Sequence, residues 1–299
     1  MHPLARMALK VSALALAFAG APPLYVYLAS EALIERRYPL PVIEEPLAAS
    51  EKDERGAHLA KIAGCADCHG PDLEGRREGL GPLHLWSTNL RIAASQNSAG
   101  EFERAVRRGL APDATSLWGM PSQDYMYMSE SDVADLYGWL QSLGPSGRVK
   151  PKPVWNLRAR FALIRDRIVP AAIATRDAPS SLDMGPRYDG GRYLARVACS
   201  ECHGTDLGGL AGAPDLISVA AYNRTAFFDL LRHGWGARGR RLHAMSRLAR
   251  LRFHVLADYE IMALFDYLSA RARAPDAMFA RARTNEQRRH EMITLEDND

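Results

Sequence analysis

Two copies of the motif C-x-x-C-H contain every cysteine of this 299-residue chain. They read Cys65-Ala66-Asp67-Cys68-His69 and Cys199-Ser200-Glu201-Cys202-His203. A chain with this many cysteines and histidines would contain one such motif by chance with a frequency of about 0.002, so two copies are not an accident of composition. No cysteine remains for a disulfide.

The motif has the spacing that attaches a haem covalently. Two cysteines three positions apart on one helical turn can both reach the vinyl groups of a haem, and the histidine beside the second lies under the iron. We therefore predict two covalently bound haem c groups. The predicted attachment residues are Cys65, Cys68, Cys199 and Cys202, and the predicted iron ligands are His69 and His203. A zinc or thiol redox site is the alternative for a lone C-x-x-C, but the adjacent histidines and the long separation of the two motifs argue against it.

The sixth iron ligand decides whether a haem transfers electrons or reacts with small molecules. A methionine ligand occupies the last coordination position and raises the reduction potential of the iron, whereas an empty position allows ligand binding or peroxide chemistry. Met120 lies in a loop before a predicted helix, where the following Pro121 stiffens the chain. Met245 holds the corresponding position in the second half, so we predict Met120 and Met245 as iron ligands. Alternatives stay open at both sites: Met126 and Met128 for the first, and His243 for the second. A His/His iron would have a lower potential.

The chain repeats itself around the two motifs. The stretch 56–64 before Cys65 matches 191–198 before Cys199 apart from one extra glycine, and 70–75 matches 204–209 after the histidines. Two copies of one module are therefore predicted.

Each copy predicts three short helices, and we find no convincing strand pattern. Apolar residues recur at three-to-four spacing before each motif, in a second segment that ends near Gly109 or Gly234, and in a third segment capped by Ser129 or Ser131 in the first copy and by Asp258 in the second. The stripes contain Leu59, Ile62, Phe102, Val106, Val133, Leu136 and Leu140 in the first copy and Leu194, Val197, Phe227, Leu231, Ile261, Leu264 and Leu268 in the second. The predicted fold class is all-α.

Loop residues after each motif supply weaker candidates. Pro82 and Pro214 follow the haem histidines at a distance that suits a backbone carbonyl accepting the histidine ring N–H, although ordinary loop prolines are nearly as good an interpretation. Three polar residues are candidates for haem propionates or for plain surface positions: Trp86, Asn89 and Arg91.

The N-terminus is predicted to be a membrane anchor. Arg6 and Lys10 precede an uncharged stretch from Val11 to Ser30, which is long enough to cross a hydrocarbon core of about 30 Å. The small residues Ala17 and Ala19 also resemble a signal-peptide cleavage site, which is the alternative. The positive-inside rule places the N-terminus in the cytoplasm and the remainder on the periplasmic side.

The segment between the two modules contains an amphipathic stretch from Trp155 to Pro170. We interpret it as a connecting helix packed against one module, with a membrane-surface helix as the alternative. The tail from Pro275 to Asp299 is charged and sparsely apolar, so a loosely ordered end is expected.

The two modules differ in charge. Residues 49–147 carry more acidic than basic side chains, and residues 186–273 carry more basic than acidic ones. Such an asymmetry either steers redox partners or draws the two modules together.

The chain resembles the di-haem cytochrome c family, and within it the membrane-anchored cytochromes related to the cytochrome subunits of bacterial alcohol and aldehyde dehydrogenases. The residues that carry the resemblance are 64–70, Thr88-Asn89-Leu90, Met120-Pro121, Tyr137-Gly138-Trp139-Leu140 and 198–204. The resemblance implies the fold, haem attachment and electron transfer, with Met120 matching the Met-Pro ligand of the family. Those subunits commonly carry three haem motifs, and this chain has two.

The sequence thus predicts two tandem cytochrome c domains behind an N-terminal transmembrane helix. The predicted parts are the anchor or signal 1–34, domain 1 at 49–147, a basic linker at 148–185, domain 2 at 186–273 and the tail 274–299. We expect an electron-transfer protein rather than an enzyme, exchanging electrons with cytochromes, a dehydrogenase or a terminal oxidase, and no nucleic-acid binding. A di-haem peroxidase-like enzyme is the alternative, and it would need one iron without methionine.

Overall fold

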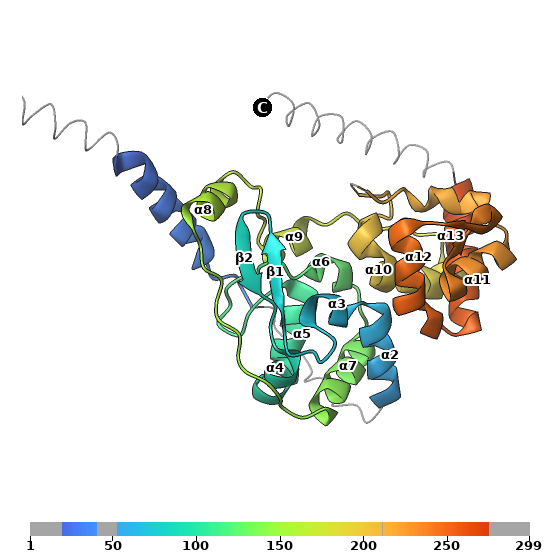
Figure 1. The fold of residues 1–299 in the computed structure, drawn as a ribbon, viewed down its shortest axis with the longest axis horizontal. Helices are drawn as coiled ribbons and strands as arrows, with labels where there is room; N and C mark the ends of the chain where they lie inside the picture. Colours follow the sequence, from blue (N-terminus) through green and yellow to red (C-terminus); the bar gives the residue numbers. More distant parts are fainter. Residues whose placement is uncertain (1–19, 41–52, 211, 275–299) are drawn as a thin grey trace, which may run out of the picture.

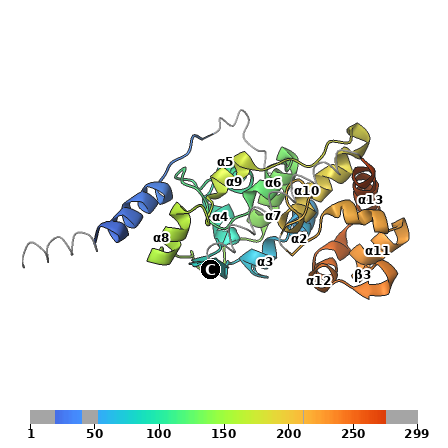
Figure 2. The ribbon, with the colours of Figure 1, turned by 90° about the horizontal axis from the view of Figure 1, so that it is seen from above.

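The computed structural model describes residues 20–40, 53–210 and 212–274, most of which are helical (Figure 1). Two views at right angles show an elongated molecule (Figures 1 and 2). The helix at 20–34 and α8 (Leu157–Ile164) lie at one end, and α11 (Arg224–His233), α12 (His243–Leu251) and α13 (Asp258–Arg273) lie at the other.

The first module contains the three predicted helices and three further short ones. Its elements are α2 (Asp53–Ile62), α3 (Cys65–His69), β1 (Arg77–Leu80), β2 (Leu83–Trp86), α4 (Leu90–Gln96), α5 (Ala99–Arg108), α6 (Ser122–Tyr125) and α7 (Glu130–Ser142). Ser129 caps α7, since its side chain accepts the Asp132 N–H. The cap is therefore Ser129 and not Ser131.

The second module has the same three main helices as the first, but its hairpin follows the middle helix instead of preceding it. Its elements are η1 (Pro186–Tyr188), α10 (Asp189–His203), η2 (Leu216–Ala221), α11, β3 (Trp235–Gly236), η3 (Ala237–Gly239), β4 (Arg240–Arg241), α12, η4 (Phe253–Val255) and α13. Asp258 is the first residue of α13 rather than its cap, and the Glu260 carboxylate accepts the Ala257 N–H at 2.9 Å instead. This shifts the predicted helix start by one residue.

The prediction that the chain lacks strands is wrong for two short hairpins. Strand β1 pairs antiparallel with β2, and β3 pairs with β4. Leu83 and Leu85 point inward from β2 and are buried, whereas His84 and Trp86 are exposed. Because this alternation lasts only four residues, it is too short to stand out in the sequence.

The extra glycine of the first repeat breaks its helix. Gly64 has a φ of 74° and separates α2 from α3, whereas α10 runs unbroken through the corresponding position. A left-handed residue ends a helix readily when it is glycine. The first motif therefore starts a new helical turn, and the second motif is the last turn of a long helix.

The predicted apolar stripes form one continuous core. The N-terminal and C-terminal helices of each module pack together, α2 against α7 and α10 against α13. One cluster contains buried side chains of both modules, which include Leu59, Ile62, Val133, Leu136, Leu140, Leu194, Val197, Leu231, Ile261, Leu264 and Leu268. Burial of this apolar surface joins the two modules as well as building each of them.

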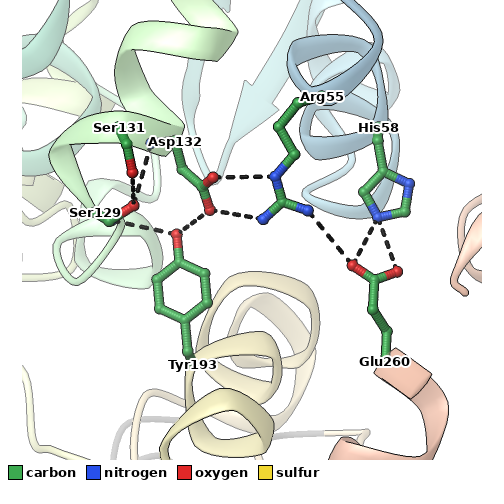
Figure 3. Close-up of polar contacts among 7 residues, drawn as sticks. All are labelled: Arg55, His58, Ser129, Ser131, Asp132, Tyr193 and Glu260. Carbon is green, nitrogen blue, oxygen red and sulfur yellow. Dashed lines mark hydrogen bonds and ion pairs between the residues drawn. The ribbon is translucent and has the colours of Figure 1, made fainter. Parts of the chain in front are cut away.

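Polar contacts also cross between the modules (Figure 3). Arg55 of α2 forms an ion pair with Asp132 of α7 at 2.9 Å and extends to Glu260 of α13 at 3.5 Å. The Tyr193 hydroxyl of α10 donates to Asp132, and His58 lies 3.0 Å from Glu260. The charged groups that cross here, Arg55 and His58 with Glu260, do not draw on the excess charge of either module.

The linker packs as the connecting-helix interpretation predicts. Ala159 and Ala162 of α8, with Ile168 beyond it, contact Leu83 and Leu85 of the β1–β2 hairpin. The helix α9 (Ala171–Asp177) follows and packs against α5 and α6. The linker therefore belongs structurally to the first module.

The predicted anchor lies largely outside the described residues. The part of Val11–Ser30 that is described belongs to the helix at 20–34, whose Glu31 forms an ion pair with Arg160 of α8 at 2.7 Å. Across the described ranges, no helix combines the length and apolar character needed to cross a membrane. The candidate cleavage site and the tail 275–299 also lie outside the described residues.

Candidate haem sites

Both C-x-x-C-H motifs adopt the same local geometry. In α3 the two cysteines lie on one turn and His69 ends the helix, followed by Gly70 with a φ of 81°. In α10 the second motif forms the last turn before Gly204, whose φ is 80°. A positive φ after the histidine turns the chain sharply away, and glycine adopts it without strain. Each glycine thus starts the loop that folds back beneath its histidine.

The ring of each motif histidine is held by a backbone carbonyl. His69 Nδ1 lies 2.7 Å from the Thr88 oxygen, and His203 Nδ1 lies 2.7 Å from the Pro214 oxygen. Because a carbonyl only accepts, Nδ1 must carry the proton, and Nε2 is left with a lone pair that can bind a metal. Burial also lowers the pKa of both histidines, which favours the neutral ring.

The prediction for Pro214 is confirmed, and the prediction for Pro82 is wrong. In the first module the carbonyl comes from Thr88, further along the chain than Pro82. The β1–β2 hairpin is inserted before this point, and Pro82 lies in its turn. The longer loop therefore places Thr88 where the shorter loop of the second module places Pro214.

All four cysteines are partly buried free thiols. Burial raises the pKa of Cys65 to about 12 and that of Cys199 to about 12. A thiol redox site needs a lowered thiol pKa, which these environments do not provide. Among the described residues, no group of three His, Cys, Asp or Glu side chains is placed to hold a metal ion.

A largely apolar cavity of about 330 Å³ lies against the first motif. It is lined by Cys65, Cys68, His69 and Met120, and by apolar side chains that include Leu85, Phe102, Val106, Leu136 and Leu140. Two thiols, an imidazole nitrogen and a thioether sulfur around an apolar space are the donor set and surroundings that a haem c requires. The residues of the first module therefore fit the group.

The structure distinguishes among the methionines and the histidine that are candidates for the sixth iron ligand. Met120 and Met128 both line the cavity, whereas Met126 is not among its lining residues. In the second module Met245 packs half-buried against the core, while His243 is exposed. This arrangement favours Met120 or Met128 at the first site and Met245 at the second.

The candidate propionate partners mainly hold the chain together. Asn89 caps α4 and donates to the Ser146 carbonyl at 2.7 Å, and Arg91 donates to the Gly144 carbonyl at 2.8 Å. Both side chains fasten the loop that follows α7. Trp86 lines the cavity, and the Lys150 ammonium lies 5.1 Å from the centre of its ring.

Two charged residues near the motifs escaped the sequence analysis. Arg252, which follows α12, forms ion pairs with Asp67 and Glu201, the acidic residues inside the two motifs. Asp124 of α6 is buried, and burial together with the charge of Glu201 raises its pKa to about 7. The sequence did contain a signal for Arg252, because Asp67 and Glu201 occupy the same position of the two motifs and could share one basic partner.

The helical module with its partly buried C-x-x-C-H turn and carbonyl-held histidine is typical of haem-binding electron-transfer proteins. Comparison with known families agrees, since residues 54–144 match the family model for cytochrome c. Residues 54–144 are therefore similar to cytochrome c.

Similar proteins extend the match beyond the first module. The fructose dehydrogenase cytochrome subunit of Gluconobacter japonicus is 24% identical over 253 residues, covering 72% of this chain and 51% of that protein. The cytochrome c subunit of a quinone alcohol dehydrogenase from Gluconacetobacter polyoxogenes is 26% identical over 201 residues, covering 60% and 42%. A di-haem c-type cytochrome from Cereibacter sphaeroides is 26% identical over 170 residues, covering 50% and 56%. The chain thus spans about half the length of the curated relatives it matches.

Proposed function

We propose that the chain is a di-haem c-type cytochrome that transfers electrons one at a time. The observation that carries the proposal is the same Nδ1–carbonyl hydrogen bond at His69 and at His203, each at the end of a C-x-x-C-H turn. Only the first module matches the family model, so this shared geometry is the support for a second haem.

The residues have separate roles in this proposal. Cys65, Cys68, Cys199 and Cys202 attach the two haems, and His69 and His203 bind the irons through Nε2. Met120 and Met245 complete the coordination. When bound, each haem supplies an iron that gains or loses one electron. The carbonyls of Thr88 and Pro214 fix the histidine rings and increase their basicity.

We further propose a membrane-tethered protein whose haem domains lie on the periplasmic side of the cytoplasmic membrane. The uncharged stretch at 11–30 and the basic residues before it support the tether. Two relatives are cytochrome subunits of dehydrogenases, so a dehydrogenase is the proposed electron donor. An intact N-terminus in the membrane fraction is the expected result of mass spectrometry, and a mature chain that begins near residue 20 would contradict the tether.

Substitution of the proposed methionine ligands tests the function. Met120→Ala and Met245→Ala should each lower the potential of one haem only and open it to carbon monoxide, because the axial ligand is a strong determinant of haem potential. Visible spectra of the oxidised protein and redox titration measure both effects. Met126→Ala is the matched control and should change neither haem. A shift with Met128→Ala and none with Met120→Ala would assign the first ligand to Met128.

The same spectra separate electron transfer from the peroxidase-like alternative. That enzyme would need an open iron with an acid or base beside it. The buried Asp124 is not among the residues that line the cavity, whereas Glu78 and Glu201 are, so the state of the iron is what separates the two functions. A high-spin iron that reacts with peroxide in the unmodified protein would overturn the electron-transfer proposal.

A further inference from the structure

Arg252 joins the two C-x-x-C-H motifs. Its Nε donates to the Asp67 carboxylate at 2.7 Å, and its Nη1 donates to the Glu201 carboxylate at 2.7 Å. Asp67 precedes Cys68 in the first motif, and Glu201 precedes Cys202 in the second. One guanidinium therefore binds the same position of both motifs.

The guanidinium is enclosed and held in place. Its side chain is 6% exposed, whereas those of Asp67 and Glu201 are 38% and 30% exposed. A Cβ added at Gly64 would lie 2.0 Å from Arg252 Cζ, so the guanidinium packs directly on the backbone before Cys65. The Arg252 N–H donates to the Leu248 carbonyl at the end of α12, which fixes the backbone from which the side chain starts.

This contact is distinct from the other polar contacts between the modules. Arg55, His58 and Tyr193 join helices away from the motifs (Figure 3). Those contacts join α2 and α7 to α10 and α13 without Arg252.

We propose that Arg252 is a positioning residue that holds the two haem-attachment motifs together and raises the reduction potential of the haem at each. This inference rests on the proposed di-haem function. A fixed positive charge near an iron disfavours the ferric state, which carries one more positive charge than the ferrous state. Because the guanidinium binds both motifs, both haems should respond to it. The planar fork of arginine can bind two carboxylates in fixed directions, which lysine cannot reproduce.

Redox titration of Arg252→Gln tests the proposal, with Arg55→Gln as the matched control. Glutamine removes the charge and leaves Asp67 and Glu201 unpaired. We expect the oxidation equilibrium of both haems to shift toward the ferric state by about tenfold, which corresponds to ~59 mV for one electron. Arg55→Gln removes an ion pair between the modules away from the motifs and should leave both potentials unchanged.

The positioning role has its own measurement. Hydrogen exchange should become faster at residues 64–69 and 199–204 in Arg252→Gln and in Arg252→Lys, while Arg252→Lys keeps the potentials closer to the original values. If Arg252→Gln does not fold, the double variant Asp67→Asn, Glu201→Gln tests the proposal instead. It removes the two negative charges that Arg252 balances and should therefore raise both reduction potentials.

The outcomes distinguish this inference from the function on which it rests. Two bound haems with unchanged potentials in Arg252→Gln, or equal shifts in Arg55→Gln, would overturn the role of Arg252 and leave the di-haem function standing. Fewer than two haems in the unmodified protein would instead contradict the function itself.

Discussion

Two neighbouring acidic groups near the motifs differ in how their charge is balanced. Glu201 has an ion pair with Arg252 at 2.7 Å. Asp124 is 5% exposed, and the ion pairs found among the described residues do not include it. Burial and the charge of Glu201 raise its pKa to about 7, from 3.8. The folded chain therefore holds a proton on Asp124 that the unfolded chain releases.

Asp124 should make stability fall as pH rises. Since its folded pKa lies above its unfolded pKa, the folded state binds more protons between about pH 4 and pH 7, and stability decreases across this window. Asp124→Asn removes the titration and should increase the free energy of unfolding at pH 8 by up to about 4 kcal/mol, with little change at pH 4. Denaturant unfolding at several pH values measures this.

The exposed Asp72 supplies the control for this prediction. Asp72→Asn should leave the difference in stability between pH 5 and pH 8 as it is in the unmodified protein. If Asp124→Asn shows the same dependence on pH as the unmodified protein, then Asp124 is ionised in the folded state across this range.

At the scale of the elements, each module depends on a close helix crossing at a glycine. A Cβ at Gly56 would lie 2.2 Å from the Asp135 carbonyl oxygen, and one at Gly191 would lie 2.0 Å from the Ala263 oxygen. Both glycines stand in the first turns of the helix that leads to the motif. The crossing therefore sets where α2 meets α7 and where α10 meets α13.

Gly191→Ala should destabilise the protein because α13 cannot move away without opening the core. The expected loss is about 1–3 kcal/mol, the usual cost of overpacking. Gly190→Ala is a matched control one residue away, since a Cβ there meets no atom within 4 Å. It should be neutral or stabilise α10 by up to about 1 kcal/mol. Thermal unfolding compares the two, and equal melting temperatures would contradict the close crossing.

The sequence predicted the repeated helices because their stripes are regular and their ends carry caps and glycines. It did not predict the β1–β2 hairpin, since four-residue strands give too little alternation to recognise. Without the hairpin, it could not predict that the Thr88 carbonyl accepts the hydrogen bond from His69. Arg252 also escaped, because the contact it makes depends on how two distant segments pack. The sequence showed Gly64 as an insertion in the first repeat. That this glycine breaks the helix became clear only from its positive φ in the structure.

At the scale of the whole molecule, the two modules form one packed unit rather than two independent carriers. The shared core and the contacts of Arg55, Tyr193 and Arg252 join them. Of these contacts, the Arg252–Asp67 ion pair joins a basic group of the second module to an acidic group of the first, whereas the Arg55–Glu260 pair has the opposite polarity. The helix at 20–34 lies at the end opposite α12 and α13 (Figure 1), so a tether there would leave the second module away from the membrane.

The central claim is that both motifs carry a haem, and the mass of the intact, denatured protein tests it most directly. We predict the mass of the polypeptide plus two haem groups, and plus one haem group when Cys199 and Cys202 are both replaced by alanine. Covalent attachment through both cysteines is what keeps the groups bound after denaturation. A mass with a single haem in the unmodified protein would contradict the account.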